Sequence, residues 1–393
     1  MKIDIAVHGR FHAFDLANQL HRRGALGRLY TTYPEFAAKK FMPPNAAVKC
    51  FPHFEAWRRL SSRLGLARTL SAGLPRRFGG AVAKHLVHSS SDILVGWSSA
   101  TLESIPVARD LGMKVVIERG STHIVHQTEV LRVAYDEIGQ PFTDTPQEIV
   151  DREMREYDLA DAIAVPSTIA AESFIRRGIP EEKLIVSRLG VDLDAFRPDP
   201  ESAGRAERPR ILCVGAVGVR KGAETLIRAV DKLRGAAELH LVGVVEDGFR
   251  ALLDRLPLEH VVLAGAVPHH ALVETYRGAD IFCLPSVEEG FGMVVLEAMA
   301  SGLPVVVSDQ VGARDAISGE AGIVVPVADV DALAEALRAI VEDPQKRREM
   351  GERARQAAVG GANGWEDYVD RLWPAYLALA GGARSSGRCD AGQ

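Results

Sequence analysis

The most informative segment reads Pro285-Ser286-Val287-Glu288-Glu289-Gly290-Phe291-Gly292-Met293-Val294-Val295-Leu296-Glu297-Ala298-Met299-Ala300-Ser301-Gly302-Leu303-Pro304. It predicts a buried strand ending at Leu284, a glycine turn, and a helix from about Met293 that Gly302 and Pro304 stop. Glycines let backbone amides approach a phosphate, and the helix N-terminus adds unpaired N–H donors and the positive end of its dipole. Glu289 and Glu297 flank this position with carboxylates, which accept hydrogen bonds from sugar hydroxyls.

A second phosphate site is predicted at Val214-Gly215-Ala216-Val217-Gly218-Val219-Arg220-Lys221-Gly222. The loop follows an apolar strand and precedes a helix that is expected to begin near Ala223. Its glycines permit a tight turn, and Arg220 and Lys221 supply positive charge. No Ser or Thr follows Lys221, so the loop is not a Walker-type phosphate loop.

Short apolar runs alternate with amphipathic segments along nearly the whole chain, which predicts an α/β protein with parallel sheets. The expected strands are Ile3–His8, Leu29–Thr32, Ile93–Gly96, Val115–Glu118, Ala162–Pro166 and Leu184–Ser187, then Ile211–Gly215, Leu239–Gly243, Val261–Gly265, Ile281–Pro285, Val305–Ser308 and Ile323–Val325. A Pro-rich, charged segment between the two sets predicts an interdomain linker.

We therefore expect two Rossmann-like doubly wound domains that face a central cleft. The N-terminal domain spans residues 1–195, the linker 196–209, and the C-terminal domain 210–364. A helix over about residues 365–380 is expected to pack back on the N-terminal domain, followed by a flexible tail at 381–393.

Composition excludes several other classes of protein. Of the 393 residues, 47% are hydrophobic and 25% charged, which is too apolar for a disordered chain. The formal charge of −5 does not favour nucleic-acid binding. No long apolar segment or signal peptide is apparent, so we expect a cytoplasmic protein or one peripheral at the inner face of the membrane.

The segment that begins at Pro285 resembles the signature of family-four retaining glycosyltransferases of the GT-B fold. The resemblance lies in the Glu289-x7-Glu297 pair around Gly-Phe-Gly, with Pro-Ser before it and Glu-Ala-Met-Ala-x-Gly-x-Pro-Val at its end. The resemblance extends over nearly the whole C-terminal domain. It implies that Lys221, in the loop that begins at Gly215, binds the donor diphosphate. Many members carry an arginine where this chain has Ala216, and we expect Arg220 to supply that charge.

The same resemblance implies that Glu289 contacts the donor sugar and Glu297 the ribose hydroxyls, with backbone around Val267 near the base. Gly290, Phe291, Gly292 and Met293 then form the phosphate-facing turn and helix start. The family needs no metal, and no other cofactor is expected. A turn is the favoured interpretation of Asp192-Leu193-Asp194, although its spacing also resembles a metal-binding pair.

The N-terminal domain offers weaker candidates. Gly9 and Arg10 follow the first strand, where family members often have two glycines, so Arg10 binds acceptor or diphosphate or is simply a surface residue. Arg119 stands where many members have a histidine near the reacting carbon, and His123 follows four residues later. Both are kept as catalytic candidates.

The N-terminal end of the chain is strongly basic, although the total charge hides this. Residues 1–88 carry a net charge of +11 and residues 89–393 one of −16. Within residues 49–88, arginines and apolar residues alternate at helical spacing around Trp57, as in helices that lie on membrane surfaces. An anionic membrane surface is one predicted partner, and an ordinary solvated helix pair is the equal alternative.

The expected function is retaining, metal-independent transfer of a sugar from a nucleotide-diphosphate donor, UDP- or GDP-linked, to a hydroxyl of a glycan or lipid-linked saccharide. The product would belong to cell-surface polysaccharide or glycoconjugate biosynthesis. A GT-B-type nucleotide-sugar epimerase is an alternative, whose signature residues are absent. A non-catalytic nucleotide-sugar-binding protein is another, against which Glu289, Lys221 and Glu297 argue.

Overall fold

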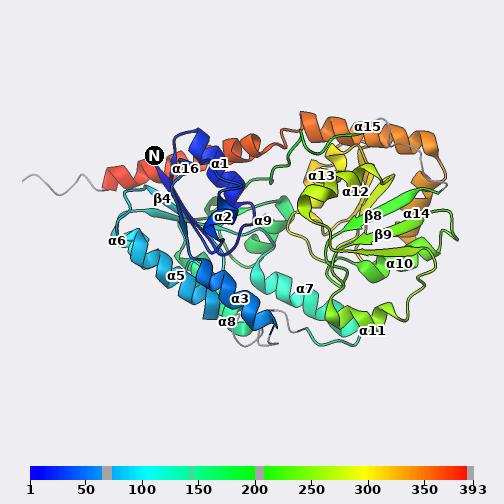
Figure 1. The fold of residues 1–393 in the computed structure, drawn as a ribbon, viewed down its shortest axis with the longest axis horizontal. Coiled ribbons are helices and arrows are strands. Elements are labelled where there is room, and N and C mark those ends of the chain that lie inside the picture. Colours follow the sequence, from blue (N-terminus) through cyan, green and yellow to red (C-terminus); the bar gives the residue numbers. More distant parts are fainter. Residues whose placement is uncertain (64–72, 143–144, 200–207, 387–393) are drawn as a thin grey trace, which may run out of the picture.

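Two α/β domains lie side by side in the computed structural model, which describes residues 1–63, 73–142, 145–199 and 208–386 (Figure 1). Each domain has one fully parallel sheet with helices on both faces. The predicted α/β class with two Rossmann-like domains is therefore confirmed.

The N-terminal sheet has the strand order β3-β2-β1-β4-β5-β6-β7. Its strands are β1 (Ile3–Val7), β2 (Leu26–Thr31), β3 (Val48–Cys50), β4 (Ile93–Trp97), β5 (Lys114–Glu118), β6 (Ala162–Val165) and β7 (Leu184–Val186). Its helices are α1 (Ala13–Arg22), α2 (Glu35–Ala38), α3 (Pro52–Arg63), α5 (Gly73–Leu86), α6 (Ser104–Asp110), α7 (Ile124–Glu137), α8 (Gln147–Leu159) and α9 (Thr168–Ile175), with a 3-10 turn at Glu181–Lys183.

The C-terminal sheet has the order β10-β9-β8-β11-β12-β13. Its strands are β8 (Arg210–Val214), β9 (Glu238–Val242), β10 (Val261–Gly265), β11 (Ile281–Leu284), β12 (Val305–Ser308) and β13 (Gly322–Val325). Its helices are α10 (Ala223–Asp231), α11 (Arg250–Leu253), α12 (Leu272–Arg277), α13 (Met293–Ala300), α14 (Val330–Val341) and α15 (Pro344–Gly360), with 3-10 turns at Asp247–Phe249, His269–Ala271 and Gly312–Ala316 (η4).

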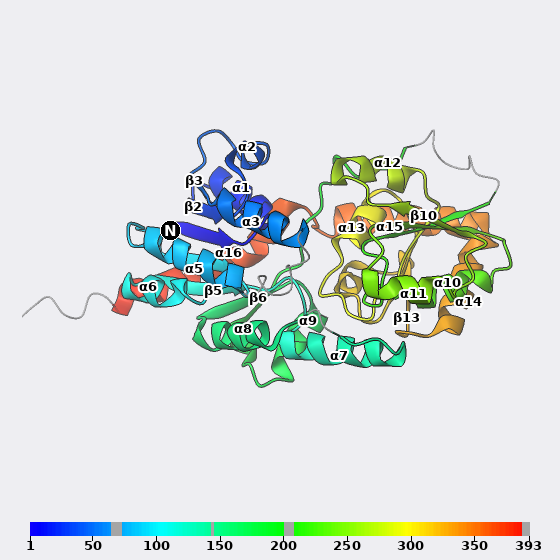
Figure 2. The same cartoon turned by 60° about the horizontal axis from the view of Figure 1, so that its bottom comes forward.

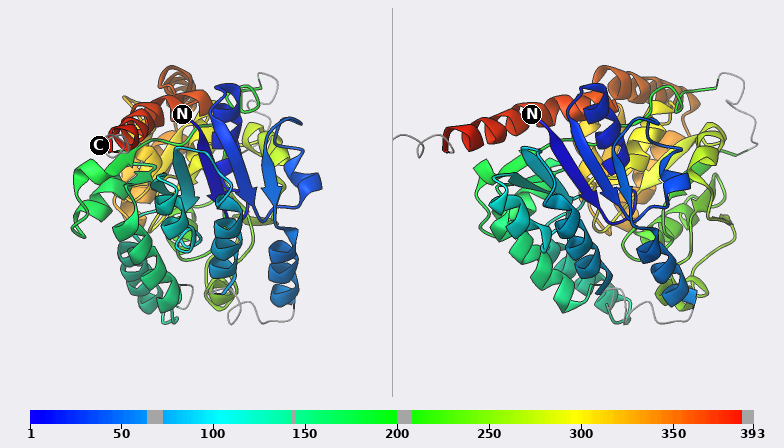
Figure 3. Two further views of the ribbon diagram at one scale, coloured as in Figure 1. Left: turned by 90° about the vertical axis from the view of Figure 1, so that its left-hand side faces the viewer. Right: turned by 60° about the vertical axis from the view of Figure 1, so that its left-hand side comes forward.

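The central strands are buried on both faces, which is why they appear in the sequence as apolar runs. Every residue of β1 is buried, because helices cover both faces of a parallel sheet, and alternate side chains enter different cores. Ile3, Ile5 and Val7 join the core that contains α1, whereas Ala6 joins the core that contains α5 and α8. Figure 3 shows these helix layers on opposite sides of the N-terminal strands.

All twelve strands expected from the sequence are present, and of the strands in the described residues only β3 is not among them. This edge strand is only Val48–Cys50, and all three of its residues are half-buried. So short a strand on the rim of the sheet lacks the apolar run that marks the central strands.

The last helix, α16 (Trp365–Ser386), returns to the N-terminal domain (Figure 1 and Figure 2). Tyr368, Leu372 and Tyr376 are fully buried, and the Tyr368 hydroxyl donates to Glu118 Oε1 at 2.7 Å. The helix continues to Ser386, past the residue 380 expected from sequence, so the glycines of the tail do not end it. Residues 387–393 lie outside the described residues.

Candidate active site

The segment from β11 to α13 forms the strand-turn-helix unit that the sequence predicts. Gly292 takes a left-handed φ of 91° immediately before the first residue of α13, a conformation that favours glycine. Phe291 is 1% exposed and Met293 packs partly buried against the same core. The turn is therefore anchored by Phe291, and the N-terminus of α13 points its unpaired N–H groups toward the space before it.

The loop after β8 lies directly against this unit. Gly222 has a φ of 67° and caps α10, and a Cβ there would lie 2.0 Å from the Pro285 carbonyl oxygen, so only glycine fits. The Val287 N–H donates to the Arg220 carbonyl at 2.9 Å. Gly215 (φ 142°) leaves room for the Lys221 side chain, which passes 3.1 Å from where its Cβ would be.

Two cations and two carboxylates pair across these loops. Lys221 Nζ pairs with Glu289 Oε2, and Arg220 Nε donates to Glu288 Oε2 at 2.9 Å. The side chains of Lys221 and Glu289 are only 17% and 12% exposed, so the pair is largely shielded from water. The predicted residues Lys221 and Glu289 are thus in direct contact, and Arg220 pairs with the neighbouring carboxylate of Glu288.

Glu297, in α13, is 3% exposed and holds two partners. Its Oε2 accepts from the Tyr276 hydroxyl at 2.8 Å, and its Oε1 lies 3.0 Å from His269 Nε2. The hydrogen bond to Glu297 raises the pKa of His269 above its ordinary value, against the opposing effect of burial. Val267 is half-buried two residues before His269, on the same side of the domain.

Glu288 is the residue that sequence reasoning missed. Its carboxylate is 2% exposed and contacts both domains: Ser121 and Thr122 in the N-terminal domain and Arg220 in the C-terminal one. The sequence does carry a signal for Glu288, because two adjacent cations, Arg220 and Lys221, match two adjacent carboxylates, Glu288 and Glu289. In the structure Arg220 pairs with Glu288 and Lys221 with Glu289.

The two domains also touch through backbone at this point. A Cβ on Gly290 would lie 2.2 Å from the Ser121 Cα, so the turn packs directly on the loop after β5. Ser167 Oγ donates to the Gly290 carbonyl at 2.6 Å, and both the N–H and the hydroxyl of Thr168 donate to Asp315 in η4. The carboxyl ends of β5 and β6 thus face the predicted phosphate turn.

Of the N-terminal candidates, Gly9 and Arg10 lie in the loop between β1 and α1. Gly9 has a φ of 113°, and its carbonyl accepts a hydrogen bond from Thr31 Oγ1 at 2.6 Å. The Arg10 guanidinium stacks 3.7 Å from the centre of the Phe41 ring. Arg10 Nε is buried and has no hydrogen-bond partner among the described residues.

Arg119 and His123 differ in position. Arg119 Nη1 donates to Glu153 at 3.1 Å and Nη2 to Gln127 at 2.6 Å, next to the Glu288 contacts. Burial lowers the pKa of Arg119, but the nearby carboxylate of Glu153 more than offsets this and the pKa lies above its ordinary value. Arg119 is therefore tied into the domain interface.

His123, the second catalytic candidate, is fully buried. His123 is 0% exposed, and its ring packs on Tyr157 and Phe174 in the core of the N-terminal domain. Its Nδ1 accepts from the Val125 N–H and so caps α7. Burial lowers the pKa of His123 to about 4, so it is neutral.

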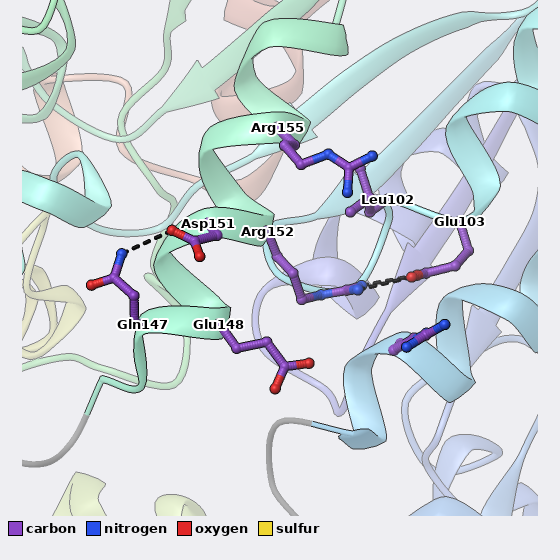
Figure 4. A pocket seen from close by; sticks show the side chains of 8 residues that line it. Leu102, Glu103, Gln147, Glu148, Asp151, Arg152 and Arg155 are labelled. Carbon is purple, nitrogen blue, oxygen red and sulfur yellow. Dashed lines mark hydrogen bonds and ion pairs between the residues drawn. The ribbon is translucent and has the colours of Figure 1, made fainter.

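A separate cavity of about 490 Å³ lies in the N-terminal domain between α5, α6 and α8 (Figure 4). Its charged lining is internally paired in part, since Arg152 makes two hydrogen bonds to Glu103 and Gln147 one to Asp151.

The Asp192-Leu193-Asp194 segment forms a turn, because the Asp192 carboxylate accepts hydrogen bonds from the N–H groups of Asp194 and Ala195. Within the described ranges, no group of three or more His, Cys, Asp or Glu residues is arranged to hold a metal ion.

Two Rossmann-like domains that face each other are the arrangement of the GT-B fold. The same fold occurs in sucrose-phosphate synthase from Thermosynechococcus elongatus, with a TM-score of 0.72 and 22% identity over 97% of this chain and all of that one. Anabaena HepE in complex with UDP-glucose gives a TM-score of 0.69 at 17% identity, over 96% of this chain and 100% of that one.

Residues 197–357 match the family model described as "Glycosyl transferases group 1". A GDP-mannose-dependent phosphatidylinositol monomannoside mannosyltransferase of Mycolicibacterium smegmatis is 32% identical over 51% of this chain and 58% of its own length. A D-inositol 3-phosphate glycosyltransferase of Kribbella flavida is 31% identical over 65% of this chain and 64% of its own length. The chain thus spans less than two thirds of each of these relatives.

Proposed function

We propose that this protein is a retaining, metal-independent glycosyltransferase that uses a UDP- or GDP-linked sugar as donor. One observation carries the proposal: the ion pairs of Arg220 and Lys221 bring these cations and Glu289 to the loops before α13, and Glu297 lies within α13. This arrangement offers cations and N–H donors to a diphosphate and carboxylates to sugar and ribose hydroxyls. The match of the C-terminal domain to a glycosyltransferase family supports it.

The chemistry that follows is mainly electrostatic. As the bond between the sugar and the diphosphate breaks, negative charge grows on the leaving phosphate, and Arg220, Lys221 and the amides at the start of α13 stabilise it. Glu289 orients the sugar through its hydroxyls. The acceptor hydroxyl attacks the same face of the sugar and passes its proton to the leaving phosphate oxygen, which retains the configuration at the anomeric carbon.

For the acceptor, we propose a glycan or lipid-linked saccharide bound on the N-terminal domain. Both curated relatives described above act, by their names, on inositol-containing acceptors. Exposed Trp57 and Leu60 on α3 and exposed Arg76 and Arg77 on α5 supply apolar and basic groups for an anionic membrane surface. Arg58 and Arg59 both pair with Glu55, so part of the predicted charge is neutralised within α3.

No helix in the described part of the chain is long and apolar enough to cross a membrane. Of the other basic positions predicted to face the membrane, Arg68 lies outside the described residues. The salt dependence of vesicle binding, set out in the Discussion, tests this attachment.

The transferase proposal is tested with K221A and E289Q. UDP and GDP are first screened by thermal shift, since a bound nucleotide raises the melting temperature. Transfer from the corresponding labelled donor to membrane lipids is then measured, with the product's anomeric configuration assigned by NMR. Each variant should lose about 10²-fold or more in kcat/KM, whereas K232A and E342Q, at surface ion pairs, should not. Full activity of either site variant contradicts the proposal.

A further inference from the structure

The Glu288 carboxylate lies at the junction of the two domains and accepts five hydrogen bonds. Its Oε1 accepts from Ser121 Oγ at 2.7 Å, Thr122 Oγ1 at 2.7 Å and the Thr122 N–H at 3.3 Å. Its Oε2 accepts from Gln127 Nε2 at 3.0 Å and Arg220 Nε at 2.9 Å. Every partner except Arg220 belongs to the N-terminal domain.

These contacts keep Glu288 charged. Burial alone would raise its pKa, but Arg220 and the hydrogen bonds from Ser121, Thr122 and Gln127 lower the pKa of Glu288 to about 2. A buried charge with all partners in place is stable, whereas removal of a partner leaves it uncompensated. The carboxylate therefore depends on the N-terminal domain for most of its stabilisation.

The same carboxylate fixes one cation of the predicted diphosphate site. Arg220 Nε is held by Glu288 Oε2 and by the Glu288 carbonyl at 3.2 Å, and Nη2 lies 3.5 Å from Ser121 Oγ. Because a guanidinium is planar, holding it along the Nε edge sets the direction of both terminal nitrogens. Nη1 has no hydrogen-bond partner within the described residues, so it is available to an incoming anion.

We propose that Glu288 is a positioning residue that couples the N-terminal domain to the diphosphate site. It would turn Arg220 toward the diphosphate only while Ser121, Thr122 and Gln127 hold the carboxylate in place. Donor affinity would then depend on these N-terminal contacts to Glu288, as well as on the C-terminal domain that carries the nucleotide. The inference rests on the proposed function, because it gives Arg220 a diphosphate to bind.

Simple electrostatics predicts that loss of the Glu288 charge changes nucleoside diphosphate affinity in the opposite direction from loss of its positioning role. Glu288 is a negative charge close to an anion site, so its neutralisation alone should strengthen the binding of a nucleoside diphosphate. Loss of orientation should weaken binding instead, since a guanidinium released from its partner must be ordered again when the anion binds. The direction of the change in E288Q therefore separates positioning from charge.

The experiment measures the affinity of the full-length protein for UDP and GDP, and for uridine and guanosine, by calorimetry. E288Q should bind the nucleoside diphosphate about tenfold more weakly and the nucleoside unchanged. T122V, which removes one hydrogen bond to Glu288 without touching Arg220, should weaken it about threefold. In an R220A background, E288Q should cause no further loss.

Asp315 provides the matched control, because it is also a carboxylate that joins the two domains, through Thr168, but does not contact Arg220. D315A should bind the nucleoside diphosphate as the wild type does. Circular dichroism and thermal unfolding of each variant show that it is folded, and T122V keeps the test valid if E288Q is not.

Three results would overturn the inference: equal or tighter binding by E288Q, an equal loss in D315A, or an undiminished effect of E288Q without Arg220. If E288Q binds equally or more tightly while the wild type binds the nucleoside diphosphate and transfers sugar, the proposed function stays intact. A wild type that binds neither UDP nor GDP and transfers no sugar removes the proposed function, and this inference falls with it.

Discussion

Substitution of Gly290 by alanine tests whether sugar transfer requires the close contact between the two domains at Gly290. Gly290 does not have a positive φ, so alanine is compatible with its backbone. The added Cβ, however, would lie 2.2 Å from the Ser121 Cα and 2.8 Å from the Gly120 carbonyl oxygen. Both atoms are backbone of the other domain, and neither can move aside as a side chain does.

The size of the effect follows from these distances. Carbon atoms pack at about 3.7 Å, so the loop after β5 must withdraw from the turn by about 1.5 Å. The cheapest relief is a slightly wider gap between the domains, which leaves each core intact. A misplacement on the order of 1 Å costs about 10²-fold in rate when two bound reactants must meet. We therefore expect G290A to lose about 10²-fold in kcat/KM with its melting temperature nearly unchanged.

The assay compares sugar transfer and thermal unfolding of G290A with those of G80A. Gly80 lies in α5, and a Cβ there meets nothing within 4 Å, so alanine should stabilise that helix by about 1 kcal/mol and leave transfer unchanged. Wild-type activity of G290A would refute the argument, because the domains would then not need to approach as closely as Gly290 and Ser121 do here.

Two further predictions concern pH and membranes. Glu297 raises the pKa of His269, so the charged pair stabilises the fold below about pH 6.5 and its contribution is lost as the pH rises through the higher folded-state value. The melting-temperature difference between wild type and H269Q should therefore shrink from about pH 6 to about pH 8, and a constant difference would argue against the pair. Vesicles containing phosphatidylglycerol should bind the protein at low salt, release it at high salt, and bind R76Q/R77Q at least roughly tenfold more weakly. Equal binding to neutral phosphatidylcholine vesicles would exclude an electrostatic attachment.

The C-terminal domain could be predicted well because its information is local. Buried parallel strands appear as apolar runs, and the turn before α13 needs glycine at the left-handed Gly292, so strand, turn and helix are all written in consecutive residues. The pairing of Lys221 with Glu289 also follows, since the carboxyl ends of neighbouring parallel strands β8 and β11 bring their loops together.

Contacts between the domains could not be predicted in this way. Ser121 and Glu288 are 167 positions apart, and their hydrogen bond depends on how two separately folded domains meet. The surroundings of His123 could not be predicted for the same reason, because its ring packs against Tyr157 and Phe174 from later segments of the chain. The sequence by itself determines two Rossmann-like domains and the loops that carry Lys221 and Glu289, because those depend on local pattern. Only the tertiary structure decides which N-terminal residues face the site, because a side chain's environment is set by segments that fold far from it in the chain.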